Sequence, residues 1–127
     1  MDILLIKPYW TDKIFLNDKC WEIRGSNTKK RGIIGIAKSG TGQVFGTVRL
    51  FDSISLTKEL WECNRDKHQV ELSWEELLKI YKHPYAWVLT EKNQYAEPIP
   101  YNHPQGAVIW VKTDIEPPVT LENDYER

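Results

Sequence analysis

The sequence predicts an α+β fold, a small and mostly antiparallel β-barrel with helices packed on its outside. The first observation behind this prediction is the order of the elements: a strand, a helix and then several strands, with two short helices inserted before the last strands. The second is composition, since 41% hydrophobic and 28% charged residues in a chain of 127 are typical of one globular domain with a real core.

The elements follow from local patterns along the chain. Residues 3–7 are a short apolar run that Pro8 ends, which is typical of a buried strand. Apolar residues at near-helical spacing predict a helix over 9–16, and residues 19–24 are expected to be extended. Residues 25–30 carry Gly, Ser, Asn, Thr and lysines, so they predict a charged loop.

The second half of the chain shows the same kinds of signal. Ser73 and Glu76 have the spacing of a capping box, which starts a helix that ends before His83 and Pro84. The other expected elements are a strand at 32–37, a hairpin turn at 40–42, a strand at 43–51, a short helix at 55–61 and strands at 85–90 and 107–112, the last two separated by a proline-punctuated stretch.

The ends of the chain set the domain limits. We expect one domain over residues 1–116 and an acidic tail over 117–127, because Pro117 and Pro118 interrupt any strand and acids dominate after them. The amino terminus lacks the basic and apolar regions of a signal peptide, and Cys20 and Cys63 cannot form a disulfide framework. These features predict a cytoplasmic protein without a membrane segment.

Charge is distributed unevenly although the net charge is only −1. Between residues 19 and 38 a single acid, Glu22, accompanies six basic residues: Lys19, Arg24, Lys29, Lys30, Arg31 and Lys38. A basic face of this kind suits phosphate, and it equally suits a solvated loop. Cys63 and His68 lack the second pair of ligands that a structural zinc needs, and residues 64–67 between them are expected to form a surface loop, so we expect no metal and no cofactor.

The segment from Lys19 to Arg24 carries the candidate chemistry. An extended backbone places Glu22 and Arg24 on one face and Trp21 and Ile23 on the other, which we take as the core side. Lys19, at the start of the strand, could bend toward the same space. The alternative is a plain salt-bridged strand face.

The whole chain resembles an ASCH domain, a family of PUA-like barrels with a Lys-x-x-Glu-x-Arg signature after the first helix. Here the signature is Lys19, Glu22 and Arg24. The resemblance covers roughly residues 3–112 and includes four further motifs: Ile6-Lys7-Pro8, Arg31-Gly32, the segment from Tyr85 to Leu89, and the segment from His103 to Trp110.

The resemblance implies binding of single-stranded RNA or of a modified nucleotide in a cleft between barrel and helices. Arg24 and Lys19 would then contact phosphate or base edges, Glu22 would accept from an exocyclic amine, and Trp10, Trp21 or Trp87 would stack a base. The further candidate contacts are Lys7, Lys29, Lys30, Arg31, Lys38 and Ser39, the last through a backbone amide. The oligomeric state stays open.

Two alternatives remain at this point. Some relatives in the family are amidohydrolases of acetylated cytidine with a Lys-x-x-Thr-x-Arg pattern, and Glu22 stands here in place of their threonine nucleophile. A small hydrolase of a modified nucleoside or of RNA would therefore need Lys19 and Glu22 as an acid–base pair. The other alternative is an interaction module without a nucleotide ligand.

Overall fold

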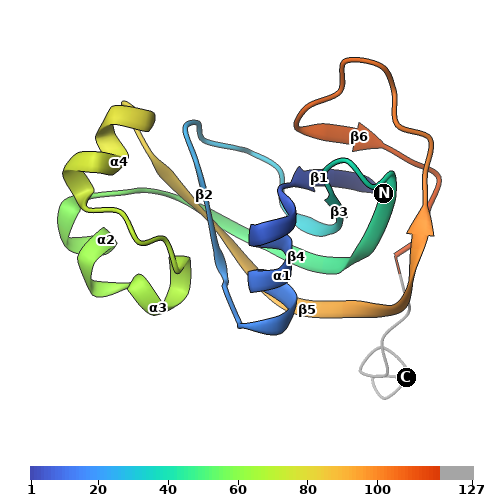
Figure 1. Ribbon diagram of the computed structural model, residues 1–127, viewed down its shortest axis with the longest axis horizontal. Helices are drawn as coiled ribbons and strands as arrows, with labels where there is room; N and C mark the ends of the chain where they lie inside the picture. The colour runs from blue at the N-terminus through green and yellow to red at the C-terminus, as the bar shows by residue number, and fades with distance from the viewer. Residues whose placement is uncertain (118–127) are drawn as a thin grey trace.

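The computed structural model describes residues 1–117 and contains one six-stranded sheet with the strand order β2-β5-β4-β3-β1-β6 (Figure 1). Only β1 and β3 pair in parallel, and every other neighbouring pair is antiparallel. The strands are β1 (Asp2–Ile6), β2 (Trp21–Arg24), β3 (Gly32–Lys38), β4 (Gln43–Ser55), β5 (Tyr85–Pro100) and β6 (Trp110–Lys112).

The sheet curls into a half-barrel whose two edge strands are β2 and β6. Across the curl, the Arg24 side chain of β2 donates a hydrogen bond from Nη2 to the Leu5 carbonyl of β1, at 3.0 Å. This bond links an edge strand to a strand on the other side of the sheet, where no backbone ladder joins them. The predicted α+β class and mostly antiparallel barrel-like sheet are confirmed.

Helices occupy two places on this sheet (Figure 1). Helix α1 (Pro8–Leu16) starts with proline, whose missing N–H is not needed in a first turn, and packs on β3 and β5. The other three helices lie between β4 and β5 in sequence and gather at one end of the molecule: α2 (Lys58–Cys63), α3 (Arg65–His68) and α4 (Trp74–Ile80). We call residues 56–84 the insert. The predicted capping box of Ser73 and Glu76 starts α4.

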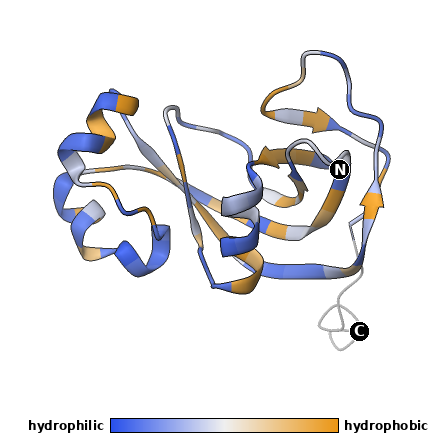
Figure 2. Cartoon of the chain, in the orientation of Figure 1, coloured by the Kyte–Doolittle hydropathy of each residue, from blue (hydrophilic) through white to orange (hydrophobic). Residues whose placement is uncertain are grey.

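Two of the three clusters of buried residues within residues 1–117 follow this division. The sheet core consists of Leu4, Ile6, Ile14, Phe15, Ile34, Ile36, Val48, Leu50, Trp87 and Leu89. The insert core consists of Trp21, Ile23, Leu56, Trp61, Leu77 and Ala86. Figure 2 shows hydrophobic residues concentrated on the central strands, whereas the helices of the insert are hydrophilic with hydrophobic bands.

The structure corrects three sequence-based boundaries. Strand β5 continues through Pro98 to Pro100 where we expected an irregular stretch, because β2 pairs only with its first residues and leaves the rest as a free edge, where proline is tolerated. The last strand is shorter than 107–112. Helix α3 occupies residues that we expected to be a surface loop.

The ends of the chain add two observations. No helix within residues 1–117 is both long enough and apolar enough to cross a membrane. Apart from Pro117, the acidic tail expected over 117–127 lies outside the described residues.

Candidate functional site

A cavity of about 360 Å³ lies where β2, the start of α1 and the insert meet. This volume is within the range of small-molecule sites in proteins. Its lining residues are Leu5, Lys7, Trp10, Lys19, Glu22, Ile23, Arg24, Ser39, Val70, Leu72, Leu77, Ile80, Tyr81 and Val108.

Strand β2 places the acid and the guanidinium of the signature in this cavity. Side chains alternate along an extended strand, so Glu22 and Arg24 share a face while Trp21 packs in the insert core. Ile23 also belongs to the insert core but reaches the cavity wall. The predicted division of β2 into a core face and a polar face therefore holds at these positions.

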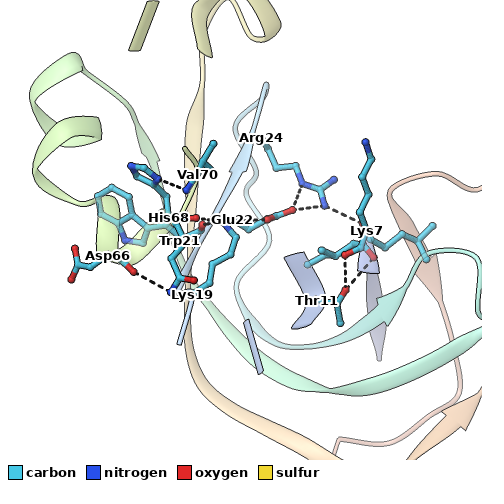
Figure 3. Close-up of polar contacts among 12 residues, drawn as sticks. Lys7, Thr11, Lys19, Trp21, Glu22, Arg24, Asp66, His68 and Val70 are labelled. Atoms are coloured by element: carbon cyan, nitrogen blue, oxygen red, sulfur yellow. Dashed lines mark hydrogen bonds and ion pairs between the residues drawn. The ribbon is translucent and has the colours of Figure 1, made fainter. Parts of the chain in front are cut away.

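Glu22 and Arg24 form a well-ordered ion pair (Figure 3). Glu22 Oε2 accepts from Arg24 Nε at 3.1 Å and lies 2.9 Å from Arg24 Nη2, which also donates to the Leu5 carbonyl. Glu22 is only 5% exposed, and the guanidinium of Arg24 lies 5.5 Å from the centre of the Trp87 ring. Charge pairing and backbone bonding together fix the guanidinium in one orientation.

Lys19 approaches the pair from the turn before β2, where Asp18 has a φ of 60°. The lysine is 2% exposed, and its Nζ donates to the Trp21 carbonyl at 2.7 Å and to the His68 carbonyl. The ammonium lies 4.0 Å from Glu22 Oε1 and 4.6 Å from the centre of the Trp10 ring. Burial lowers the pKa of Lys19 to about 8, even though the Glu22 carboxylate acts to raise it.

One carboxylate oxygen of Glu22 has no hydrogen-bond donor among residues 1–117. Arg24 binds Oε2, whereas Oε1 lies 4.0 Å from the Lys19 ammonium and accepts no hydrogen bond from that part of the chain. Glu22 lines the cavity, so the lining includes an anionic acceptor beside a cation.

The insert supplies an apolar part of the cavity lining. These residues are Val70, Leu72, Leu77, Ile80 and Tyr81. Leu77 lies on α4 and Tyr81 directly follows it, and neither was expected to contact a ligand. Val70 and Leu72 carry no recognisable signal, because they lie in a connection without regular secondary structure.

The remaining predicted contacts divide into two groups. Lys7, Trp10 and Ser39 line the cavity with the signature residues. The four basic residues Lys29, Lys30, Arg31 and Lys38 do not line it, and three of these pair elsewhere: Lys30 with Asp2, Arg31 with Asp52 and Lys38 with Asp12. The structure thus separates the basic loop from the cavity that the signature residues share.

Comparisons with known proteins agree with the fold. No protein-family model and no curated protein sequence matches the chain. Three crystal structures of the ASCH protein from Zymomonas mobilis do match. A single-residue variant has 16% identity and a TM-score of 0.65, covering 87% of this chain and 85% of that one. The unsubstituted protein has 17% identity and a TM-score of 0.62, covering 78% of this chain and 72% of that one.

A second single-residue variant has 18% identity and a TM-score of 0.61, and covers 78% of this chain and 74% of that one. At these low identities the similarity supports a shared backbone fold and gives no information about a shared ligand. The resemblance first indicated by Lys19, Glu22 and Arg24 is thus matched in three dimensions, and the chain has the fold of the ASCH proteins.

Proposed function

We propose that this protein binds a nucleobase, carried by a modified nucleotide or by single-stranded RNA, in the cavity lined by Lys19, Glu22 and Arg24. The observation that carries the proposal is the Glu22 carboxylate between the Lys19 and Arg24 cations in the lining of a cavity of about 360 Å³, with Oε1 accepting no hydrogen bond from residues 1–117. A base edge presents N–H donors next to carbonyl or ring-nitrogen acceptors. Glu22 accepts from such a donor, and the guanidinium and ammonium donate to the neighbouring acceptors.

The other lining residues support a flat ligand with an apolar part. Val70, Leu72 and Tyr81 offer apolar and aromatic surface to a ring, and Trp10 adds a second aromatic group. Lys7 and Ser39 lie at the same cavity and can contact a sugar or phosphate attached to the base. Mostly apolar lining with a few placed polar groups is typical of small-molecule sites.

The basic residues outside the cavity allow an experiment to distinguish binding of RNA from binding of a free nucleotide. A longer RNA would contact Lys29, Lys30, Arg31 and Lys38 with its phosphates, so its affinity would fall with salt. A free nucleotide held by the cavity alone would show little such dependence. The salt dependence of affinity therefore distinguishes a base read within RNA from a free nucleotide.

The experiment is a calorimetric titration with a panel of modified nucleosides and short single-stranded RNAs. Losing a hydrogen bond to the charged Glu22 removes about 1.5 to 3 kcal/mol, so Glu22→Gln should weaken binding roughly 10- to 150-fold. Arg24→Ala should weaken it as well. The exposed Glu97 serves as the matched control, and Glu97→Gln should bind like the wild type. Equal affinity of wild type and Glu22→Gln for every ligand bound would overturn the proposal.

Hydrolysis at the same site is a second candidate, favoured by the lowered pKa of Lys19 beside Glu22. In this mechanism Glu22 activates a water molecule, and Lys19 stabilises the oxyanion that develops. Glu22→Gln would then stop product formation while binding persists, whereas a pure binder forms no product in the wild type. If neither Lys19→Ala nor Glu22→Gln changes any nucleic-acid readout, the interaction module without a nucleotide ligand is favoured instead.

A further inference from the structure

The insert contains a buried histidine directly after the residues that were expected to form a surface loop. His68, at the end of α3, is 0% exposed, and its ring stacks on Trp61 with a centroid distance of 3.7 Å and an interplanar angle of 6°. Both ring nitrogens are engaged by the backbone: Nδ1 accepts from the Val70 N–H at 3.0 Å, and Nε2 lies 2.8 Å from the Trp61 carbonyl. Because Nδ1 accepts, the proton is on Nε2 and the imidazole is neutral.

This stack holds two parts of the cavity in place. The main-chain carbonyl of His68 accepts from the Lys19 ammonium, and its ring accepts from the amide of Val70, a cavity residue (Figure 3). The Trp61 indole donates from Nε1 to the carbonyl of Leu72, the next cavity residue along the segment, at 2.9 Å. One aromatic pair thereby anchors the segment 68–72 at both ends.

We propose that His68 is a positioning residue for the candidate site: its neutral imidazole, stacked on Trp61, holds the anchor of Lys19 and the Val70–Leu72 wall, and protonation releases both. The consequence for ligand binding rests on the proposed function. The release itself concerns only residues of this chain.

Hydrogen-bond chemistry supplies the mechanism of the release. A proton on Nδ1 turns an acceptor into a donor that faces the donating N–H of Val70, so that hydrogen bond is lost and two donors oppose each other. Nε2 keeps its bond to the Trp61 carbonyl, but the new Nδ1–H is a buried donor without an acceptor on a charged ring, which is unfavourable. The segment that contains Val70 relieves this conflict by moving away from the ring, and the adjacent His68 carbonyl moves with it.

Three charged groups act on the imidazole. Lys19, from the turn before β2, and Arg65, on α3 itself, oppose its protonation, and Asp66 of α3 favours it. Burial is the largest influence and lowers the pKa of His68, which the bond to the Trp61 carbonyl acts to raise. The stack is therefore stable at neutral pH and is lost as the pH falls below the ordinary histidine range near 6.5.

The test follows the Lys19 ammonium and the Val70 amide by NMR of the full chain labelled with ¹⁵N, from pH 7.0 to pH 4.5, a range in which Lys19 with its pKa of about 8 is mostly protonated. Both signals should change with one common midpoint below about 6.5, the midpoint of the His68 ring itself, while sheet-core amides keep their shifts. In His68→Asn the side-chain oxygen takes the place of Nδ1 and cannot titrate. Both signals should then persist at neutral pH without the acid step. The exposed His83 gives the matched control, and His83→Asn should keep the step.

Each other result overturns the inference. If the Lys19 signal stays unchanged while the His68 ring titrates, His68 does not control the position of Lys19. If the acid step persists in His68→Asn, another group causes that step. Loss of the Lys19 signal only together with the sheet-core signals means global unfolding and not local release.

The NMR test requires no ligand, so its result can be interpreted even if the panel titration finds no ligand. If the panel yields a ligand, its affinity should fall roughly tenfold one pH unit below the His68 midpoint, because about a tenth of the protein then keeps the competent arrangement.

Discussion

The sheet core and the insert are held together by different kinds of bond. Strands β3 and β4 form seven residue pairs with one register shift, and they contribute Ile34, Ile36, Val48 and Leu50 to the apolar sheet core. In the insert, the connection between α3 and α4 belongs to no strand, and its backbone is bonded by the side chains of Trp61, Arg65 and His68. A ladder survives the loss of one side chain, whereas these bonds depend on individual residues.

The candidate site lies where the two regions meet. The edge strand β2 supplies Glu22 and Arg24, and β1 supplies the carbonyl that fixes Arg24. The insert supplies the second carbonyl for Lys19 and an apolar share of the cavity lining. The orientation of Arg24 therefore depends on the sheet, and the position of Lys19 depends on the insert.

The largest expected effect comes from breaking the sheet core. Ile36 is 0% exposed in the middle of β3, so Ile36→Ala should lower the free energy of unfolding by about 2 to 5 kcal/mol. Urea denaturation measures this loss. Phe51 on β4 is 62% exposed, and Phe51→Ala should change the value by no more than about 0.5 kcal/mol. Equal losses in the two variants would contradict the assignment of the core.

A second effect concerns the buried Lys19 ammonium. Its pKa of about 8 in the fold lies below the ordinary lysine value near 10.4, so above pH 8 the folded state releases this proton before the unfolded state does. The unfolded state then binds more protons, and stability rises with pH from about 8 to 10.4. The slope from this group is at most about 1.4 kcal/mol per pH unit.

The contribution of Lys19 is isolated by comparison with Lys19→Met. Other lysines and the tyrosines titrate in both proteins, so the difference between the two curves of unfolding free energy against pH reports Lys19 alone. The difference should grow in favour of the wild type as the pH rises. Parallel curves would show that the folded Lys19 keeps an ordinary pKa.

The difference between the sheet core and the insert also explains which features could be predicted from the sequence. Alternation and proline positions located the strands, and the spacing of Lys19, Glu22 and Arg24 predicted a shared polar space before any coordinates. The expectation failed at residues 64–67, which looked like a surface loop although Arg65 to Lys67 belong to α3. Side chains that bond a distant backbone follow no periodicity, so no local pattern indicates that His68 stacks on Trp61.

The ion pairs of the basic residues were not predictable for a related reason. Lys30, Arg31 and Lys38 form a cluster in sequence, which favoured a common phosphate surface. In the fold each pairs with an acid from a different element, namely Asp2, Asp52 and Asp12. These pairs are partly exposed and individually weak, so phosphate can still compete for the cations. Sequence clustering does not reveal such pairing, because the acids are distant in the chain.

The smallest effect tests whether the two regions unfold together. Ser73 Oγ accepts from the Glu76 N–H at 3.1 Å, and the Ser73 N–H donates to Glu76 Oε1 at 3.0 Å. Ser73→Ala should therefore lower stability by about 1 kcal/mol. Because α4 belongs to the insert, native-state hydrogen exchange should show faster exchange in α4 and unchanged protection of β3 and β4.

The exposed Ser55 at the end of β4 makes no such bond to a helix, so Ser55→Ala is the matched control and should leave both regions as they are. Suppose instead that Ser73→Ala lowers protection equally in α4 and in the sheet. The insert would then open only when the whole domain unfolds, and a local acid release of Lys19 could not occur while the sheet stays folded. The small effect of a single helix cap thus decides whether the two regions respond separately.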